Sequence, residues 1–205
     1  MDKYDIKKAR KAWYGAPVGA FVRLDMPAMD YYMIDGAGDP NTAAEYAAAV
    51  EALYAASYTL KFMSKADLRR DYVVPPLEGL WWADDLSDFV ARRKDRWRWT
   101  MMIVVPEFVG RAMAEAAIAK AQEKKGLAAL SRLRYERLEE GPVVQTLHVG
   151  SYDDEGPVLK RLHEEFLPAQ SLVPTGHHHE IYLSDPRKTA AAKLKTILRQ
   201  PVRVG

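Results

Sequence analysis

The stretch YYMIDGAGDPNTAAEYAAAVEALY, Tyr31–Tyr54, decides how the fold of this chain is interpreted. Its first part is a short apolar run that ends in a turn rich in glycine and proline, which is typical of a strand. The alanine-rich sequence that follows has apolar side chains at helical spacing and predicts a helix over residues 41–65. Thr42 and Glu45 are spaced to form a capping box at the start of this helix.

The same order of elements returns in the second half of the chain. TLHVGSYDDEGPVLKRLHEEF, residues 146–166, again combines a strand, a turn and a helix. Two strand candidates follow each helix: LEGLWWA (77–83) and TMMIVVPE (100–107), then HHEIYLS (178–184) and TILRQPVR (196–203). The pattern therefore predicts an α+β fold in which a strand–helix–strand–strand module is duplicated with pseudo-twofold symmetry around a central ligand cleft.

The predicted domain organisation is an N-terminal extension over residues 1–20 and one domain over residues 21–205. The domain holds two pseudo-repeats, about 21–106 and 132–205, joined by an alanine-rich helix that ends at Gly126 as a C-cap residue. The extension is basic, and we expect it to be mobile.

Composition and charge exclude several classes of function. The 205 residues carry 30 basic and 28 acidic side chains, so the net charge of +2 gives no broad reason to expect nucleic acid or a membrane as partner. The chain has no cysteine, which removes disulfides, thiolate catalysis and cysteine-based metal sites. It has no signal peptide and no apolar run of the roughly 20 residues needed to span a bilayer, so we expect a cytoplasmic protein.

Candidate catalytic residues follow from the alternation of side chains along strands. Glu180 and Tyr182 share one side of an extended strand. The predicted repeat between the two halves of the chain places Glu78 opposite Glu180 by pseudo-twofold symmetry. We therefore expect two carboxylates and several aromatic rings to face one cleft. A carboxylate among aromatics loses hydration, which raises its pKa and suits it to proton transfer. The alternatives are an exposed edge-strand residue for Glu180 and a plain loop residue for Glu78.

The three histidines of HHHEIYL, His177–Leu183, suggest a metal site. Adjacent strand residues point to alternating sides, however, and no acid or histidine lies at a helical spacing from them in a zinc-enzyme pattern. We therefore predict no metal. His177 belongs to a polar loop that enters a strand, and His179 lies near the mouth of the pocket.

Aromatic side chains supply candidate ligand-binding surface. The tryptophans of GLWW and RWRW offer flat apolar faces to a planar ligand, but packing in the core is the competing interpretation. Alternation allows only some of them to face one cleft, and the choice between Trp81 and Trp82 stays open. The basic and aromatic stretch ARRKDRWRW, residues 91–99, is compatible with nucleic-acid contact, but near-neutral net charge favours a solvated face. The candidate ligand-binding residues are Trp81, Trp82, Trp99, Tyr152 and His179.

Four stretches, MIDGAGDPN, PLEGLWW, HVGSYDDEGPVLKRLHEEF and HHEIYLSDPRKTAAAKLKTILRQPV, resemble the GyrI-like small-molecule-binding proteins. The resemblance implies the duplicated module described above. Relatives serve as effector-binding domains of transcription regulators, as a DNA gyrase inhibitor and as stand-alone proteins, some of which hydrolyse cyclopropanoid DNA-alkylating natural products. The family's usual pocket acid matches Glu180, and Trp81, Trp82 and Tyr152 match positions that line or border the cleft in similar proteins.

The resemblance implies a stand-alone protein that hydrolyses strained cyclopropanoid electrophiles without metal or organic cofactor. In this hypothesis Glu180 or Glu78 is the base, and Tyr182 or Tyr152 donates a hydrogen bond to the carbonyl oxygen that gains charge. Non-catalytic binding or sensing of hydrophobic or cationic molecules, and gyrase-inhibitor-like interaction, are the alternatives. About 20 residues precede the region of resemblance, too few for a helix-turn-helix module, so we expect a small-molecule partner and no direct nucleic-acid contact. A homodimer stays open.

Overall fold

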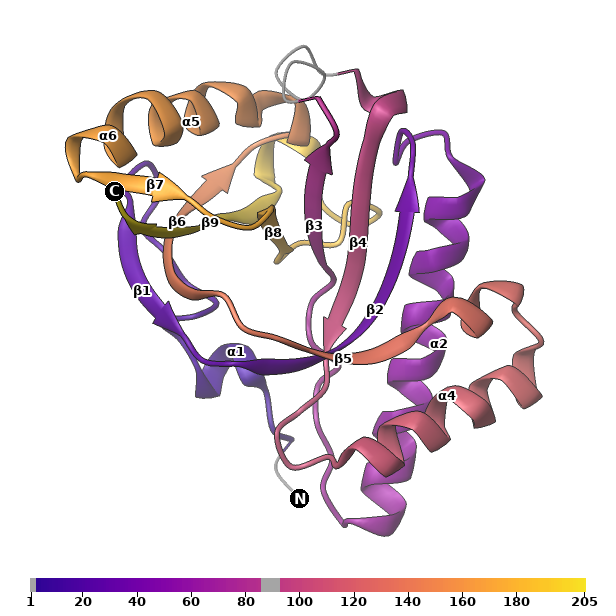
Figure 1. The fold of residues 1–205 in the computed structure, drawn as a ribbon. Helices are drawn as coiled ribbons and strands as arrows, with labels where there is room; N and C mark the ends of the chain where they lie inside the picture. The colour runs from indigo at the N-terminus through magenta and orange to yellow at the C-terminus, as the bar shows by residue number, and fades with distance from the viewer. Residues whose placement is uncertain (1–2, 86–92) are drawn as a thin grey trace. The chain divides into compact units, whose positions relative to one another are not determined.

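A computed structural model describes residues 3–85 and 93–205 of the chain (Figure 1). The chain forms two compact units, each assembled from separate segments. Unit 1 comprises Met1–Ala9, Met29–Pro75 and Gly79–Leu138, and unit 2 comprises Arg10–Ala28, Pro76–Glu78 and Glu139–Gly205.

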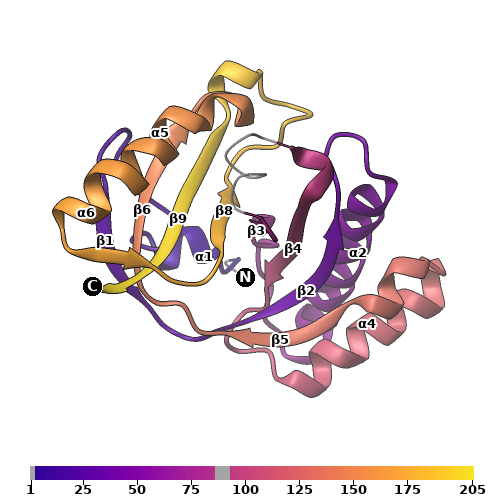
Figure 2. The same cartoon turned by 45° about the horizontal axis from the view of Figure 1, so that its top comes forward.

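Unit 1 contains an antiparallel sheet and two long helices. Strand β2 (Met29–Ala37) pairs with β4 (Trp97–Val104) and with β5 (Arg134–Leu138), and the strand order is β3-β4-β2-β5, with β3 at Glu78–Ala83. Helix α2 (Ala44–Asp67) packs against β2 and β4, and α4 (Arg111–Lys125) packs against α2 (Figures 1 and 2). The shorter helical segments are α1 (Ile6–Ala9), η1 (Lys94–Arg96) and η2 (Ala128–Arg132).

The helices and strands predicted in this half are confirmed, but the capping box at the start of α2 does not form. The N-cap residue is Ala43, and no side chain caps the helix. The backbone carbonyl of Asp39 instead accepts hydrogen bonds from the N–H groups of Thr42 and Ala43, at 3.1 and 2.8 Å. This turn delays the start of the helix, and Glu45 is drawn into an ion pair with Arg132.

Two glycines of unit 1 occupy positions that other residues would fill poorly. Gly126 has a φ of 62° and ends α4 in the left-handed conformation, which confirms its predicted role as a C-cap residue. Gly36 lies against the indole of Trp99, and a Cβ atom there would come within 2.1 Å of the ring. Glycine at this position therefore lets a fully buried tryptophan cross the neighbouring strand.

Unit 2 contains antiparallel strands with a helical segment on one face. The strand order is β1-β6-β9-β8, and β7 pairs with β9. The helical segment runs through η3, α5, η4 and α6, and in both views α5 and α6 lie over β6 and β9 (Figures 1 and 2). The bounds are β1 Val22–Met26, β6 Gly141–Val149, η3 Tyr152–Glu155, α5 Gly156–Lys160, η4 Arg161–Phe166, α6 Leu167–Ala169, β7 Leu172–Pro174, β8 His178–Tyr182, η5 Ala191–Lys193 and β9 Lys195–Val204.

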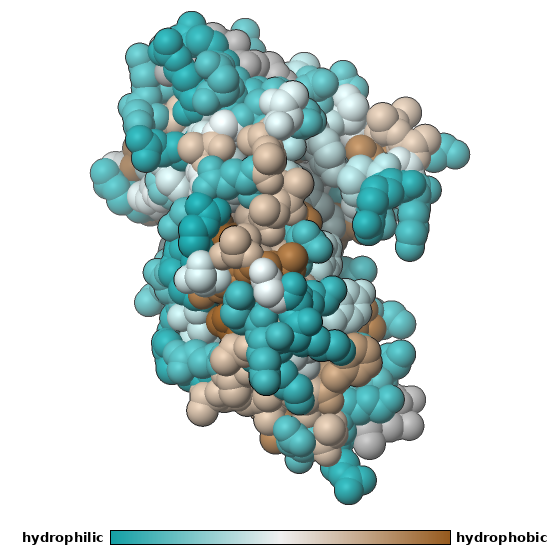
Figure 3. All heavy atoms as spheres, turned by 90° about the vertical axis from the view of Figure 1, so that its right-hand side faces the viewer, coloured by the Kyte–Doolittle hydropathy of each residue, from teal (hydrophilic) through white to brown (hydrophobic). Residues whose placement is uncertain are grey.

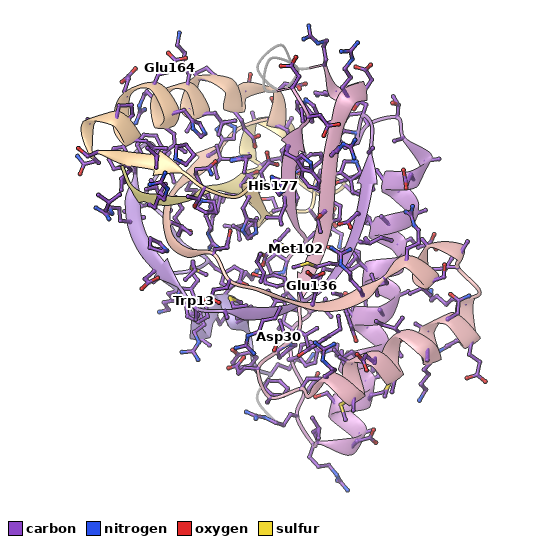
Figure 4. The ribbon with its side chains drawn as sticks, viewed as in Figure 1. Trp13, Asp30, Met102, Glu136, Glu164 and His177 are labelled. Carbon is purple, nitrogen blue, oxygen red and sulfur yellow. The ribbon has the colours of Figure 1, made fainter. Side chains whose placement is uncertain are left out.

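The helical segment of unit 2 contains a π-helical stretch that shifts its buried side. Helical spacing predicts Leu162 and Phe166, four residues apart, on the buried stripe. The structure buries Leu162 and Leu167 completely and leaves Phe166 half-buried, because the wider π turn brings residues five apart onto one face. Leu162 and Leu167 pack against Val144 of the sheet, whereas Glu164 points away from it (Figure 4).

The N-terminal extension is packed into the fold, so the expectation that it is mobile is wrong. Tyr4 forms a bridge to Tyr72 in unit 1. In unit 2 the Tyr14 side chain is buried, and the backbone N–H of Leu147 donates to the carbonyl of Pro17 at 3.2 Å. Apolar and polar groups of this segment thus have partners in both units.

The surface over α2 and α4 carries small groups of apolar side chains among hydrophilic ones (Figure 3). Tyr58 and Phe62 on α2 are 48% and 63% exposed. Across the described part of the chain, no helix combines the length and apolar character needed to cross a membrane.

The basic and aromatic stretch of residues 91–99 lies partly outside the described residues, since its first two positions are not included. In the remainder, Arg98 forms an ion pair with Asp84 at 2.6 Å, and Trp99 is fully buried. This arrangement supports the interpretation of a charged surface beside an apolar strand.

Candidate functional site

The register of β6, β9 and β8 assigns the polar residues of unit 2 to two faces of its sheet. Gln145 lies opposite Arg199, and Arg199 lies opposite His179, so these three side chains form a row on one face. Because successive strand residues alternate, Glu180 lies on the other face. Val144 also lies on that other face and packs against the helical segment, so Glu180 shares the helix-covered face.

On the helix-covered face, Glu180 contacts Tyr182 and His178, and Tyr182 in turn contacts Tyr152. The Tyr182 hydroxyl donates to Glu180 Oε2 at 2.7 Å, which confirms that the two residues share one side of the strand as alternation predicts. His178 Nε2 lies 3.4 Å from Glu180 Oε1. The Tyr152 ring meets the Tyr182 ring edge-on at 5.6 Å. The Glu180 side chain keeps 13% of its surface exposed, so the carboxylate is oriented by neighbours and still reached by solvent.

Tyr152 remains a hydrogen-bond donor over a wide pH range. Burial, together with the nearby negative charges of Glu155, Glu180 and Asp185, raises the pKa of its hydroxyl to about 12. A phenol of this kind keeps its proton at neutral pH. The same carboxylates make the surroundings of the two tyrosine rings favourable for positive charge.

Glu78 lies on the opposite face from Glu180, which corrects the expectation that the two carboxylates face one cleft. Glu78 is 1% exposed and lies with Oε2 2.9 Å from Nε2 of His179. The Tyr14 hydroxyl donates to its other oxygen, Oε1, at 3.1 Å. The physical reason is the alternation along β8, since His179 and Glu180 are neighbours in sequence and therefore point to opposite sides.

His179 is fully buried between two carboxylates, so its predicted place at a pocket mouth is wrong. Its Nδ1 lies 2.9 Å from Glu140 Oε1, and its Nε2 faces Glu78. Burial alone would lower the pKa of the imidazole, but the charge of Glu140 and the hydrogen bonds to both carboxylates raise it above its ordinary value, against the opposing charge of Arg199. Because a carboxylate faces each ring nitrogen, this arrangement favours the doubly protonated ring, which can donate one N–H to each carboxylate.

Glu140 is the second carboxylate of this group, and it is correspondingly easy to ionise. Burial would raise its pKa, but the charges and hydrogen bonds of His179 and Arg199 lower it to about 2. Arg199 reaches Glu140 Oε2 through Nη1 at 3.3 Å. We call Glu78, Glu140, His179 and Arg199 the buried charge network.

The buried charge network is continued by hydrogen bonds to the N-terminal segment. Arg199 donates through Nη2 to the carbonyl of Trp13 at 2.7 Å and through Nε to Gln145 Oε1 at 3.0 Å (Trp13 is labelled in Figure 4). Gln145 Nε2 donates to the carbonyls of Ala12 and Gly15, at 3.1 Å each. Glu140, Gln145 and Arg199 were not among the predicted site residues. Among these three, only Arg199 has a signal in the sequence, as a charged side chain inside the largely apolar strand TILRQPV.

Two of the candidate tryptophans are buried in unit 1. Trp99 is fully buried and meets the Tyr46 ring edge-on at 5.3 Å, and Trp81 is 5% exposed with the same ring at 6.2 Å. The burial of Trp81 and Trp99 and their contacts with Tyr46 therefore favour the interpretation that the two tryptophans pack in the core. Trp82 is half-buried on the other side of β3, and its contact with a ligand stays a prediction.

His177 is an exposed loop residue directly before β8, as the sequence predicts (Figure 4). Within residues 3–85 and 93–205, no group of at least 3 His, Asp or Glu side chains is arranged to hold a metal ion.

These features define an α+β protein with an acid and two tyrosines on one face of a sheet. Residues 23–203 match the family of the GyrI-like small molecule binding domain, and the chain belongs to this family. No match was found among the curated proteins.

Three solved structures show how widely the fold is shared. An uncharacterized conserved protein from Listeria innocua is 42% identical, with a TM-score of 0.87 and with 98% of this chain and 100% of that chain covered. A hydrolase from Listeria innocua is 42% identical over the same shares of both chains, with a TM-score of 0.84. The EcmrR C-terminal domain, 11% identical with a TM-score of 0.57 over 91% of this chain and 98% of that chain, shares the fold alone.

Proposed function

We propose that this chain is a hydrolase that opens strained cyclopropanoid electrophiles by activating water at Glu180. The observation that carries the proposal is the hydrogen bond from the Tyr182 hydroxyl to Glu180, which orients a partly exposed carboxylate beside a second tyrosine, Tyr152. The 42% identity to a hydrolase over almost the whole chain supports hydrolysis as the class of reaction.

The proposed chemistry adds one water to a cyclopropane that is conjugated to a dienone. Glu180 takes a proton from water while the water oxygen bonds to a ring carbon. The strained carbon–carbon bond breaks, and its electron pair moves through the conjugated system onto the carbonyl oxygen. The Tyr152 O–H donates a hydrogen bond to this developing phenolate, which is then protonated by the proton that Glu180 received. The product is a ring-opened alcohol and phenol.

The two tyrosines have different roles in this proposal. Tyr182 already donates to Glu180, so it positions the base and is not available to the carbonyl oxygen. Tyr152 has a pKa of about 12 and keeps the proton that a hydrogen-bond donor needs. Glu78, with both oxygens facing buried partners on the opposite face, is left out of the reaction.

The test is turnover of a synthetic spirocyclopropyl dienone, followed by ultraviolet absorbance. Glu180→Gln keeps the shape of the side chain and removes the base, so turnover is expected to fall by at least about a hundredfold. The matched control is Glu164→Gln, because Glu164 is exposed and points away from the sheet (Figure 4). Equal turnover by Glu180→Gln and the wild type would remove Glu180 from the mechanism.

A second candidate function is binding of a cationic, hydrophobic molecule without chemistry. It is favoured by the charges of Glu155, Glu180 and Asp185 around Tyr152, because aromatic faces next to carboxylates attract cations. Quenching of intrinsic fluorescence by an aromatic cation, together with the absence of product from the dienone, would favour binding over hydrolysis.

A further inference from the structure

The buried charge network has no part in the proposed chemistry, yet one of its members, His179, directly precedes Glu180 on β8 and points to the opposite face of the sheet. Its four side chains expose 0–6% of their surfaces. Glu78 and Glu140 contribute two negative charges and Arg199 one positive charge, so the network is neutral when His179 carries a proton. A buried carboxylate without a compensating charge is strongly unfavourable, which makes that proton a structural requirement.

We propose that His179 is a positioning residue for Glu180. As an imidazolium, His179 joins β8 to Glu78 through one ring nitrogen and to Glu140 through the other. The functional part of this inference rests on the role of Glu180 in the proposed hydrolysis. The structural part concerns only which groups hold β8 and the N-terminal segment in place.

The geometry explains how His179 fixes its neighbour. Glu78 belongs to the segment Pro76–Glu78, and that segment also holds β8 through the hydrogen bond from the Tyr182 N–H to the Leu77 carbonyl at 3.0 Å. Glu140 directly precedes β6. The imidazolium therefore connects β8, the segment Pro76–Glu78 and the start of β6. These contacts also fix the position of Glu180, the next residue on β8.

Loss of the His179 proton would break one of the two carboxylate contacts. The neutral ring has a single N–H, so one of its nitrogens would face a carboxylate with lone pair against lone pair. Glu78 and Glu140 would then share only the charge of Arg199. We expect β8 to move away from the carboxylate that loses its hydrogen bond, and the Glu180 carboxylate to move with it.

The same network fastens the N-terminal segment. Arg199 and Gln145 donate to three backbone carbonyls of residues 12–15, and Tyr14 donates to Glu78. These residues precede the region 23–203 that matches the family model, and they lie on the face of the sheet opposite Glu180. Disruption of the network should therefore loosen the segment and displace Glu180 together.

The first measurement determines the protonation of His179 directly. Nitrogen NMR of the wild-type imidazoles is expected to show one ring with both nitrogens protonated well above the ordinary histidine pKa of about 6.5. His179→Gln identifies the signal by its disappearance, and His177→Gln, which alters an exposed loop residue, leaves it in place. A His179 ring that is neutral at neutral pH would overturn the proposal.

The second measurement follows Glu180 and the segment. In His179→Gln, the side-chain carboxyl resonance of Glu180 is expected to shift, and amide exchange in residues 10–17 is expected to accelerate. For the spirocyclopropyl dienone, kcat should fall about tenfold to a hundredfold with KM nearly unchanged, since misplacing a catalytic group slows the reaction without removing the contacts that bind substrate. His177→Gln is the matched control and should behave as the wild type.

A second substitution that restores the charge balance of the network is expected to restore the stability lost in His179→Gln. The double variant Glu78→Gln with His179→Gln removes one negative and one positive charge, so its network is neutral again. We expect it to unfold at a higher denaturant concentration than His179→Gln and to recover slow amide exchange in residues 10–17. If His179→Gln fails to fold, the double variant carries the test, and equal instability of the two would show that charge balance does not hold the network.

Failure of this inference and failure of the proposed function are distinguishable. Wild-type turnover by Glu180→Gln removes the proposed function, whatever His179 does. An unchanged Glu180 carboxyl resonance in folded His179→Gln, together with unchanged kcat, removes the positioning role even if Glu180 is the base.

Discussion

Glu78 and Glu180 are the same residue type in two environments that suit different tasks. Both oxygens of Glu78 face buried partners, His179 and Tyr14, so its charge serves to compensate another charge. Glu180 is oriented by Tyr182 and retains some exposure to solvent, which suits it to take a proton from water. Environment, more than residue identity, separates the structural acid from the proposed catalytic one.

Tyr182→Phe tests the orientation of Glu180. The substitution removes the 2.7 Å hydrogen bond but keeps the ring, so its edge-on contact with Tyr152 persists. Hydrogen bonds to charged groups contribute about 1.5–3 kcal/mol, so a loss of about ten- to a hundredfold in kcat on the dienone is expected. Tyr58→Phe, which removes an exposed hydroxyl on α2, is the control. A kcat equal to that of the control would contradict the role of Tyr182.

Strand alternation was sufficient to predict that Glu180 and Tyr182 lie together, because the two residues belong to one strand. It was not sufficient for Glu78, whose assignment depended on an inferred symmetry between strands. Glu140 and Gln145 carry no local signal, since their roles arise only when β6, β8 and β9 come into register. The partners of a charged side chain in an apolar strand are set by tertiary structure, and the sequence shows only that partners are needed.

At the scale of elements, local pattern predicted most strands and helices, and close packing decided the exceptions. The long alanine-rich helices and the C-cap at Gly126 follow from propensity and spacing. The capping box does not form, and the Asp39 carbonyl accepts from the Thr42 N–H, one of the two backbone donors that the box would satisfy. The π-helical stretch at η4, which exchanges Phe166 for Leu167 on the buried side, has no signature in apolar spacing alone.

Gly36→Ala tests the close approach of β2 to Trp99. A methyl group would come within 2.1 Å of a ring that is fully buried and has no room to move. Overpacking of this kind costs about 1–3 kcal/mol, and we expect a decrease in the free energy of unfolding at the upper end of that range. Denaturant unfolding followed by tryptophan fluorescence measures it.

Gly156→Ala is the matched control for this substitution. Gly156 begins α5 with an ordinary helical backbone, and no atom lies within 4 Å of the added methyl. Alanine should therefore stabilise by about 0.5–1 kcal/mol through a less flexible unfolded chain. Equal effects of the two substitutions would contradict the packing of Trp99 against Gly36.

For the whole molecule, the buried charge network predicts a stability that falls at both ends of the pH range. Glu140 has a pKa of about 2 against a reference value of 4.5, so its contribution is present above pH 4.5 and lost as the pH falls through 2. The pKa of His179 is raised above 6.5, so its contribution is fully present below pH 6.5 and is lost as the pH rises through the folded-state pKa.

Urea unfolding over a series of pH values measures the decline of the free energy of unfolding on the acidic side and on the alkaline side. We expect the free energy of unfolding of the wild type to decline on the alkaline side more steeply than that of the Glu78→Gln, His179→Gln double variant, which has no proton to lose there. Parallel alkaline limbs for the two proteins would show that His179 is not charged in the native state.

The GyrI-like domain over residues 23–203 contains the strands that carry Glu78 and Glu180. In each predicted module the last strand of the chain order lies between the other two: β4 lies between β3 and β2 in unit 1, and β9 lies between β8 and β6 in unit 2. The duplication itself stays a prediction.

The central claim, that Glu180 activates water for ring opening, is tested most directly by product formed in heavy-oxygen water. Mass spectrometry of the wild-type reaction should show one heavy oxygen in each ring-opened molecule, on a carbon of the former cyclopropane. Glu180→Gln should give labelled product only at the rate of the reaction without protein. Unlabelled ring-opened product from the wild type, or labelled product at an undiminished rate from Glu180→Gln, would contradict the claim.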